Sequence, residues 1–411
     1  MATDWREMAL GDVIMLQRGH DLPIQDRKPG EIPVVTSAGI SGTHSEPKAK
    51  APGVVMGRYG TLGEIYYLRE DYWPHNTTLY VKDFKGNDPH YIYYLLKTLD
   101  FTAHNDKTSV PGLNRNHLHT IRVKFTFDVA EQRAIAHILG SLDDKIELNR
   151  RMNATLEESA RALFKSWFVD FDPVRAKMEG RQPEGIDSET AALFPDRLVE
   201  SALGLIPEGW RVGTIGSLGT IVTGKTPPTQ NKNLFDGEIL FIRIPDMHNH
   251  VFTLETAITL SQAGSAYQKN YLLPAFSVCV SCIATPGIVS LTVVPSHTNQ
   301  QINSIICNNE ASPFYVYFVA SGLHDEIVAR GSGGSATLNL NKSEFSKLLI
   351  SFPMKPALLA FHDIVKPIFY KILALQYESI SLAVTRDALL PKLLSGEVRV
   401  GPLDVGEYNY D

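Results

Sequence analysis

The chain has 411 residues, of which 44% are hydrophobic and 20% charged, so it is long enough and apolar enough for two hydrophobic cores. The first residues lack the basic and apolar regions of a secretory signal, and no apolar run approaches the ~18 residues that span a bilayer. Three cysteines are too few for a disulfide framework and are typical of a reducing compartment. We therefore predict a cytoplasmic protein of two domains with connecting segments.

The formal net charge of −6 argues, taken alone, against a nucleic-acid partner. The acidic residues are unevenly distributed, however. Residues 126–204 hold 10 Lys+Arg against 15 Asp+Glu, and residues 356–411 hold 5 against 7, whereas residues 1–125 and 205–355 are close to neutral. A near-neutral domain still binds DNA when its cations cluster on one face, with a weaker sequence-independent attraction to phosphate. The first and third segments therefore stay candidates for binding DNA, with help from a partner subunit.

An internal repeat is visible when the two halves of the chain are compared. Four sets of residues recur in the same order along the chain, at offsets that drift from 205 to 225 because of insertions: Trp5-Arg6 with Trp210-Arg211, Gly11 and Gly19 with Gly216 and Gly224, Pro89, Tyr91 and Tyr93 with Pro313, Tyr315 and Tyr317, and Leu113–Asn116 with Leu338–Asn341. Several ordered matches indicate a duplication of one unit.

Each copy begins with short β-prone runs that are separated by Gly, Pro and Asn. The predicted strands are Ile32–Thr36, Val54–Met56, Ile65–Leu68 and Thr78–Val81 in the first copy, and Ile239–Ile244, Ser277–Ile283, Val289–Val294 and Ile302–Ile306 in the second. A helix is expected near Pro89–Thr98 and another near Pro313–Ala329. We therefore predict two α+β domains, each with a mixed or antiparallel sheet.

A long helix is expected to follow each domain, because apolar residues recur there with heptad spacing. The first seam consists of Ile135, Leu139, Leu142, Ile146, Asn149, Asn153, Leu156, Ala160, Leu163 and Trp167, and adding 226 gives Phe361, Val365, Ile368, Ile372, Leu375, Ser379, Leu382, Arg386, Leu389 and Leu393. Both seams become polar near the middle. Each helix could instead lie on a globular core, but two helices of matched register favour antiparallel packing against each other. Residues 131–168 would then form a rod of about 55 Å.

Two motifs with possible chemistry are present, and we interpret both as structural. Gly219–Thr226 satisfies the phosphate-loop pattern GxxxxGK[ST], but Pro227 and Pro228 follow where that motif requires a helix. Cys279 and Cys282 would be half of a zinc site that lacks its second pair, and alternation favours a strand with buried thiols. Neither motif therefore supports a metal site or nucleotide hydrolysis.

Motifs of the enzymes that act on DNA are also missing from the sequence. We find no Asn/Asp-Pro-Pro-aromatic tetrapeptide with a glycine-rich loop, as expected for an aminomethyltransferase, and no clear Pro-Asp…Asp/Glu-x-Lys nuclease set. No catalytic residue stands out by local spacing, although catalytic triads need not be local in sequence. We therefore predict a binding protein rather than an enzyme.

Candidate DNA contacts lie in polar loops of both copies. Arg and Lys read guanine, Asn and Gln read adenine, and hydroxyl groups mostly contact phosphate. Four loops of the first copy are paired with four of the second: Gln17–His20 with Thr223–Thr226, Arg58-Tyr59 with Arg243, His75–Thr78 with Asn299–Gln301, and Lys107–Asn116 with Arg330–Asn341. The individual candidates are Arg18, Arg58, Tyr59, Asn76, Lys107, Thr108, Ser109, Arg115, Asn116, Lys225, Thr226, Arg243, Gln300, Gln301, Arg330, Ser332, Ser335 and Asn339. The alternative for any one of them is simple solvation.

Several runs resemble conserved regions of the type I restriction–modification specificity subunits. Glu131–Ala136 (EQRAIA) with Leu139–Asn149 (LGSLDDKIELN), and Ala162–Phe171, are similar to the central conserved region of that family. Ile206–Trp210 and Gly224–Pro227 resemble the entry into its second target-recognition domain, and Leu389–Glu397 resembles its C-terminal end. The second helix departs from the pattern, because it opens with Lys355–Leu359 (KPALL) instead of the Glu-Gln-Arg run.

The resemblance implies a division of the chain and a role for each part. The expected parts are target-recognition domain 1 (1–127), a central conserved helix (128–171), a linker (172–207), target-recognition domain 2 (208–354), a C-terminal conserved helix (355–398) and a tail (399–411). Each recognition domain would read one half of a bipartite site on double-stranded DNA. The paired helices would set the spacing between the half-sites. The chain itself would be non-catalytic and would bind no cofactor.

The same resemblance implies partner subunits. Two methyltransferase subunits would carry S-adenosylmethionine and flip adenine, and restriction subunits that use ATP and Mg²⁺ would join in some complexes. The acidic helices suit basic partners better than DNA. The alternative is a coiled-coil scaffold whose domains bind other proteins, and affinity for a specific duplex in the presence of the methyltransferase subunit discriminates between the two.

Overall fold

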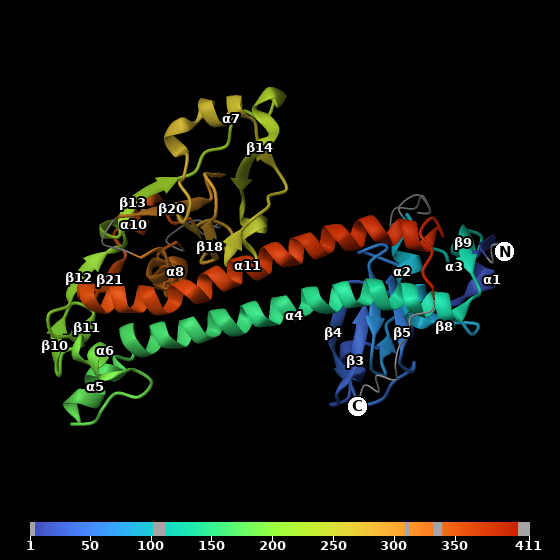
Figure 1. Ribbon diagram of the computed structural model, residues 1–411, viewed down its shortest axis with the longest axis horizontal. Helices are drawn as coiled ribbons and strands as arrows, with labels where there is room; N and C mark the ends of the chain where they lie inside the picture. Colours follow the sequence, from blue (N-terminus) through green and yellow to red (C-terminus); the bar gives the residue numbers. More distant parts are fainter. Residues whose placement is uncertain (1–4, 102–111, 309–311, 332–338, 402–411) are drawn as a thin grey trace. The chain divides into compact units, whose positions relative to one another are not determined.

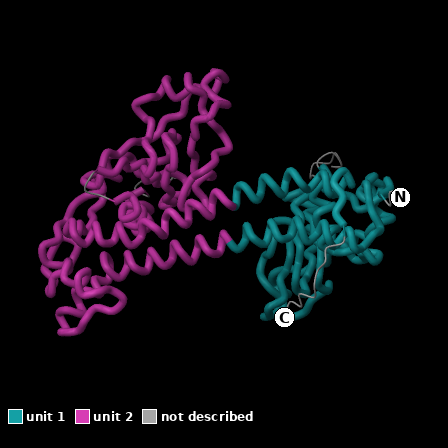
Figure 2. Tube along the Cα trace, in the orientation of Figure 1, with its two compact units in different colours: residues 1–148, 379–411 teal, residues 149–378 magenta. Residues whose placement is uncertain are grey.

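The computed structural model describes residues 5–101, 112–308, 312–331 and 339–401. The chain divides into two compact units, one of residues 1–148 and 379–411 (unit 1) and one of residues 149–378 (unit 2) (Figure 2). Two helices of 40 residues, α4 (Val129–Phe168) and α11 (Lys355–Leu394), each contribute one half to each unit (Figure 1). The mixed α and β architecture with two long helices confirms the predicted fold class.

Unit 1 contains a four-stranded antiparallel sheet in the order β2-β8-β5-β6, a smaller sheet in the order β4-β3-β7, and the pair β1-β9. Its elements before α4 are β1 (Trp5–Ala9), α1 (Leu10–Val13), β2 (Met15–Arg18), η1 (Ile24–Asp26), β3 (Ile32–Thr36), β4 (Gly39–His44), β5 (Gly53–Gly57), β6 (Ile65–Leu68), β7 (Trp73–Pro74), β8 (Thr78–Asp83), α2 (Pro89–Lys97), α3 (Arg115–His119) and β9 (Arg122–Thr126). Helix α2 starts at a proline, and the side chain of Asp88 caps it by accepting from the Tyr91 amide.

Unit 2 repeats this plan with additions. Its main sheet has the order β13-β20-β17-β18-β15, beside the sheet β16-β14-β19 and the pair β12-β21. Its elements between the long helices are α5 (Asp172–Met178), α6 (Ser188–Ala192), β10 (Leu198–Ser201), β11 (Gly204–Pro207), β12 (Arg211–Thr214), η3 (Ile215–Ser217), β13 (Gly219–Thr223), η4 (Lys232–Leu234), β14 (Phe235–Ile242), η5 (Ile244–Met247), β15 (Phe252–Thr253), β16 (Thr259–Leu260), α7 (Gln262–Tyr267), η6 (Lys269–Tyr271), β17 (Val278–Ser281), β18 (Val289–Thr292), β19 (His297–Thr298), β20 (Ile302–Cys307), α8 (Pro313–Gly322), α9 (His324–Gly331), α10 (Lys342–Ser346) and β21 (Leu349–Phe352).

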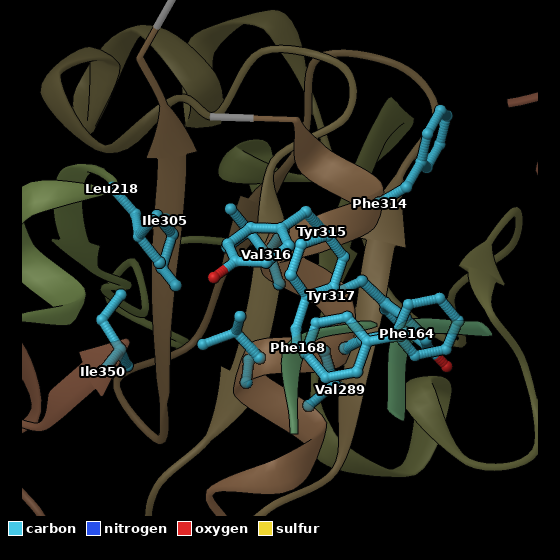
Figure 3. Close-up of a cluster of buried hydrophobic side chains, with 14 of the residues drawn as sticks. Phe164, Phe168, Leu218, Val289, Ile305, Phe314, Tyr315, Val316, Tyr317 and Ile350 are labelled. Atoms are coloured by element: carbon cyan, nitrogen blue, oxygen red, sulfur yellow. The ribbon is translucent and has the colours of Figure 1, made fainter. Parts of the chain in front are cut away.

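An aromatic core joins the long helices of unit 2 to its domain. Phe164 of α4 and Tyr315 of α8 both belong to this core (Figure 3), with ring centroids 5.7 Å apart. The ring centroid of Phe164 also lies 5.4 Å from that of Phe318 on α8. Phe361 of α11 packs against Phe164 and Phe168 of α4, with ring centroids 6.1 and 5.0 Å apart. These contacts bury large apolar rings, which is the main source of stability in such a core.

Matched backbone hydrogen bonds show that the two units share one fold. The Gly19 amide donates to the Thr78 carbonyl and the Gly224 amide to the Ile302 carbonyl. Three further bonds recur, each from the amide of the first residue to the carbonyl of the second. The unit 1 bonds His20–Pro74, His75–Val35 and Arg58–Thr77 correspond, in that order, to the unit 2 bonds Lys225–Thr298, Asn299–Ile242 and Cys282–Gln301. The predicted duplication is thus confirmed by the sheet order and by individual bonds.

Two of the predicted correspondences are wrong in register. The Leu113 amide donates to Arg58 and the Leu340 amide to Cys282, so Leu113 matches Leu340 rather than Leu338. The capping asparagines give the same corrected register, because Asn114 caps the start of α3 and Asn341 caps the start of α10. Arg58 therefore matches Cys282 and not Arg243, which follows β14. Insertions of different length before each motif had shifted the alignment.

The heptad seams of α4 and α11 face inward within each unit, as predicted, since every seam position is buried or half-buried. In unit 1 the early part of α4 packs with the late part of α11, where Asp143 and Arg386 form an ion pair at 2.5 Å. In unit 2 the late part of α4 packs with the early part of α11, and the Asn149 amide donates to Glu378 at 2.9 Å. The helices are thus antiparallel partners in both units.

The segment predicted as a linker, residues 172–207, belongs to unit 2 and contains regular secondary structure. It forms α5, α6 and the β10-β11 hairpin, and the side chains of Phe194 and Ile206 join the core of unit 2. In the part of the chain that the structure describes, no helix is both long and apolar enough to cross a membrane.

Candidate nucleic-acid interface

In unit 1, backbone hydrogen bonds bring the predicted polar loops together at one end of the main sheet. The loop after β2 is joined to the start of β8 through Gly19 and Thr78, and the loop after β5 is joined to the loop before β8 through Arg58 and Thr77. The segment before α3 then bonds to the β5 loop through Leu113 and Arg58. Four loops that are distant in sequence therefore meet around one cluster, which we call loop cluster 1 (residues 17–20, 58–59, 75–78 and 112–116).

Arg58 is the most firmly held cation of loop cluster 1. Its guanidinium stacks on the ring of Tyr59 at 4.4 Å, and its Nε donates to the Leu113 carbonyl at 3.2 Å. Tyr59 in turn lies against Gly112, where an added Cβ would come within 2.4 Å of the ring. Within the described residues no carboxylate pairs with Arg58. A half-buried, oriented guanidinium of this kind suits bidentate contact with an acceptor pair.

The other candidates of unit 1 lie around Arg58 and are less constrained. Arg18 is exposed, with its guanidinium 3.9 Å from Asp21, and the Asn76 amide also donates to Asp21. Arg115 and Asn116 are exposed at the start of α3. The remaining candidates of this copy, Lys107, Thr108 and Ser109, lie outside the described residues.

Two histidines at the base of loop cluster 1, His20 and His75, have a lowered pKa, which favours the neutral form. Burial lowers the pKa of His20 and of His75 below the ordinary value of 6.5, and neighbouring cations, Lys48 and Arg27 respectively, act in the same direction. His20 lies beside Trp73 and Tyr80, with ring centroids 6.3 and 6.0 Å apart. A neutral imidazole offers one donor and one acceptor, so it differs chemically from the nearby arginines.

Unit 2 gathers its candidates in the same way, into loop cluster 2 (residues 223–226, 243, 299–301 and 339–341). Thr226 donates from Oγ1 to the Gln300 side chain at 2.6 Å, and the Asn299 and Gln301 side chains are joined at 3.0 Å. The exposed Lys225 follows Gly224 at the end of β13. Its ammonium nitrogen lies 5.5 and 5.8 Å from the ring centroids of two tyrosines, Tyr267 and Tyr271.

Two candidates of unit 2, Arg243 and Arg330, are less available than the sequence indicated. The Arg243 guanidinium lies 3.8 Å from Asp246, a carboxylate whose side chain is only 7% exposed. Arg330 pairs with Glu326 at 2.6 Å along α9. Asn339 forms a β-bridge with Ile283 and bonds to Gly331 through its backbone, and its side chain stays exposed. Two other candidates, Ser332 and Ser335, lie outside the described residues.

Tyr267, Tyr271 and Lys48 are exposed or half-exposed neighbours of the clusters that sequence reasoning missed. The two tyrosines belong to α7 and η6, which have no counterpart in unit 1, so the repeat gave no signal for them. Lys48 lies 5.1 Å above the ring of Trp73 in unit 1. A lysine near the β7 tryptophan could have been noticed only once β7 was recognised.

The two motifs with possible chemistry are structural, as predicted. Gly219–Thr223 is strand β13, and no helix begins at Lys225 as a phosphate loop requires. Cys279 and Cys282 are buried unpaired thiols at β17, and burial raises the pKa of the Cys279 thiol to about 12 and that of Cys282 to about 11. Among the described residues, no group of three His, Cys, Asp or Glu could hold a metal ion.

Comparison with known proteins gives one consistent family. A family model described as "Type I restriction modification DNA specificity domain" matches residues 2–158 and again residues 207–372. The "Type I restriction enzyme HindI specificity subunit" of Haemophilus influenzae is 43% identical over 311 residues, covering 66% of this chain and 68% of that protein. The "Type I restriction enzyme MjaIX specificity subunit" of Methanocaldococcus jannaschii is 28% identical over 323 residues, covering 76% and 70%.

A solved structure supports the same fold. The chain resembles the crystal structure of a "Type-I restriction-modification system S subunit" from M. genitalium with a TM-score of 0.60 and 16% identity, covering 95% of this chain and 96% of that one. At this level of identity the resemblance shows a common fold, and the match over nearly the whole length includes both repeats and both long helices.

Proposed function

This chain belongs to the type I restriction–modification DNA specificity family, and we propose that loop clusters 1 and 2 are the surfaces with which it reads the two halves of a bipartite DNA site. The observation that carries this proposal is the repeated set of backbone hydrogen bonds. In both units the same bonds gather cations, amides and hydroxyls at the same end of the main sheet. These are the side chains that read base edges and hold phosphates.

The proposal extends to the residues that make contact. In unit 1 we assign DNA contact to Arg18, Arg58, Tyr59, Asn76, Lys107, Thr108, Ser109, Arg115 and Asn116, and in unit 2 to Lys225, Thr226, Arg243, Gln300, Gln301, Arg330, Ser332, Ser335 and Asn339. The contacts of these residues within the protein differ, and we use this difference to rank them as candidates for DNA contact. Arg58 and Lys225 are held by aromatic rings and have no carboxylate partner among the described residues, whereas Arg243 and Arg330 are paired with acids.

We also propose the division of labour along the chain that the sequence implies. Residues 1–127 and 208–354 act as target-recognition domains, residues 128–171 and 355–398 set the distance between half-sites, and residues 172–207 and 399–411 are linker and tail. At about 3.4 Å per base pair, helices of 40 residues are long enough to hold half-sites about one helical turn of DNA apart.

The partners that we propose supply the chemistry. Two methyltransferase subunits carry S-adenosylmethionine, restriction subunits with ATP and Mg²⁺ join where they are made, and this chain, in the cytoplasm, selects the sequence without catalysing a step. The acidic face of α4 is a candidate docking surface for them. Asp143 is unsuited to testing it because that carboxylate accepts from Tyr94 and pairs with Arg386 inside unit 1.

Asp144 is the better position for a test of docking, since its side chain is 61% exposed and the partner that it holds at 2.6 Å, Arg69, is itself an exposed side chain that can return to water. Asp144→Lys should reduce co-purification of the methyltransferase subunit, and Asp363→Lys on the exposed face of α11 serves as the matched charge reversal. Unchanged co-purification of the D144K chain would count against docking at this face.

DNA recognition is tested with the complete methyltransferase complex. Arg58→Gln should weaken binding to the cognate duplex about tenfold or more, because one oriented base contact contributes about 1–3 kcal/mol of discrimination. Lys124→Gln is the control, since Lys124 is an exposed cation on β9 outside loop cluster 1. Equal affinities of the R58Q and K124Q complexes for the cognate duplex would contradict the assignment.

A further inference from the structure

We propose that Lys225, held between the rings of Tyr267 and Tyr271, selects a guanine in the half-site that unit 2 reads. This inference rests on the proposed function of loop cluster 2. It names the base that one residue reads, and it assigns a positioning role to two tyrosines that have no counterpart in unit 1.

The backbone of Lys225 is fixed by the strand beside it. Gly224 packs so closely on β19 that an added Cβ would come within 2.2 Å of the Thr298 hydroxyl and 2.3 Å of two backbone oxygens. The next amide, that of Lys225, donates to the Thr298 carbonyl at 3.0 Å. The exposed side chain of Lys225 therefore extends from a backbone position that is fixed by its neighbours.

The two tyrosines are anchored to the same strand. Ser265, in the middle of α7, is joined at 2.9 Å to the buried ring of His297 on β19. Beyond η6, the amides of Leu273 and Ser296 bond to each other's carbonyls at 2.9 and 3.0 Å. The segment that carries Tyr267 and Tyr271 is thus tied at both ends to the β19 region, to which Lys225 is also bonded.

The side chain of Lys225 is oriented by aromatic rings rather than by a carboxylate. Its Nζ lies 5.5 Å from the Tyr267 ring centroid and 5.8 Å from that of Tyr271, within the range of a cation–π interaction. No carboxylate pairs with it among the residues that the structure describes. Aromatic rings orient an ammonium without occupying its three N–H donors, which leaves those donors for a ligand.

A donor-only group in a fixed place is suited to one base. In the major groove guanine presents two adjacent acceptors, O6 and N7, whereas thymine presents one, O4, beside its methyl group, and adenine and cytosine each present an amino donor there. A contact with phosphate needs no such orientation, because phosphates are present at every step of the duplex. Thr226 and Gln300, joined at 2.6 Å beside Lys225, leave the Gln300 amide donors on the same surface.

Unit 1 has a different group at the matched position. His20 occupies the place of Lys225, because its amide makes the equivalent bond to the Pro74 carbonyl at 2.8 Å. The His20 ring packs beside Trp73 and Tyr80 in place of an ammonium between tyrosines. We therefore expect the two units to differ in base choice at equivalent positions of their half-sites.

The inference is tested by measuring base preference, position by position, for the methyltransferase complex on a library of duplexes. Lys225→Gln should lower the preference for guanine at one base pair about tenfold or more, without changing the half-site of unit 1. Lys225→Arg should retain guanine, since arginine reads the same acceptors. Lys366→Gln, at an exposed lysine of α11, is the matched change of charge in unit 2.

The tyrosines are tested in the same assay. The double change Tyr267→Ala and Tyr271→Ala should lower the same guanine preference severalfold, whereas Tyr267→Phe with Tyr271→Phe should retain it because the rings remain. The unit 1 half-site, read by the same molecules, reports that each variant is folded and assembled.

Three results would overturn the inference. Lys225→Gln could weaken binding equally for all sequences and reduce the dependence on salt, which indicates a phosphate contact. It could leave every preference unchanged, which removes Lys225 from the interface. The alanine pair could behave like wild type, which removes the positioning role. Absence of any sequence preference in the wild-type complex would be a separate failure, that of the proposed function itself.

Discussion

The two places where a long helix starts beside its domain differ in chemistry although their backbones match. In unit 1 the indole of Trp5 donates to Glu131 at 3.2 Å, and Arg399 donates to the same carboxylate at 2.6 Å. In unit 2 the matching Trp210 lies among Phe168 and Phe171, with ring centroids 5.8 and 5.5 Å apart, and Ala357 stands in the place of Glu131.

This difference shows that the start of a long helix can be fixed to its domain in two ways, by an ionic contact in unit 1 (the ionic closure) and by packed aromatic rings in unit 2 (the aromatic closure). Unit 1 uses a carboxylate that is only 3% exposed to hold the segment after α11 against the first strand. Unit 2 uses aromatic burial, and the buried Trp210 nitrogen has no hydrogen-bond partner among the described residues. The departure seen in the sequence, KPALL in place of the Glu-Gln-Arg run, is therefore accompanied by a cluster of rings that replaces the ionic contact.

The aromatic closure should be the more sensitive of the two to truncation. Phe361 is fully buried against Phe164, Trp167 and Phe168, so Phe361→Ala should lower the free energy of unfolding by about 3–5 kcal/mol. Urea denaturation measures this, with Leu359→Ala, a 52% exposed residue of the same helix, as control. Equal losses in the two variants would mean that the aromatic cluster does not hold unit 2 together.

The ionic closure should cost less to break, because its cation can return to water. Glu131→Ala removes the acceptor of Trp5 and Arg399, but the Arg399 side chain is already 49% exposed. We expect a loss of about 2 kcal/mol in unfolding free energy, and faster amide exchange in β1 and in residues 395–401. Unchanged exchange in those segments would contradict a closing role for Glu131.

The two tryptophans offer a direct comparison of the same change. Trp5→Phe deletes a donor that Glu131 uses and should cost about 1 kcal/mol beyond the loss of volume. Trp210→Phe deletes a buried donor without a described partner, so the lost volume should be offset in part by relief of an unsatisfied group. Thermal denaturation of both variants measures which one loses more stability. A larger loss of stability for Trp210→Phe than for Trp5→Phe would contradict our account.

The smallest effect concerns pH. Burial lowers the pKa of His90 below 6.5, and the ring stacks on Tyr67 at 4.5 Å. Because the unfolded chain then binds a proton more readily than the folded one, stability is present above pH 6.5 and is lost as the pH falls below it. His90→Gln should make the unfolding free energy less dependent on pH between 7.5 and about 5.5. The exposed His137→Gln should leave that dependence as it is, and equal slopes for both variants and wild type would exclude His90.

Periodic and repeated features could be predicted from the sequence because they depend on local spacing. The heptads placed α4 and α11, and the repeated Trp, Gly and Tyr residues placed both domains. The pairing of Leu113 with Leu340 could not be predicted, because loops of unequal length hide the register. Tyr267 and Tyr271 belong to an insertion with no second copy. The contacts of Glu131 with Trp5 and Arg399 join residues that are far apart in sequence, and no local pattern specifies them.

The most direct test of the central claim is the set of methylated sites in a host that expresses this chain with its methyltransferase. We predict a bipartite motif with a fixed spacer for the wild-type chain. Arg58→Gln should relax one half of that motif, and Lys225→Gln should relax only the other half. A motif without two halves, or a change in both halves on substitution of either residue, would contradict the assignment of one half-site to each unit.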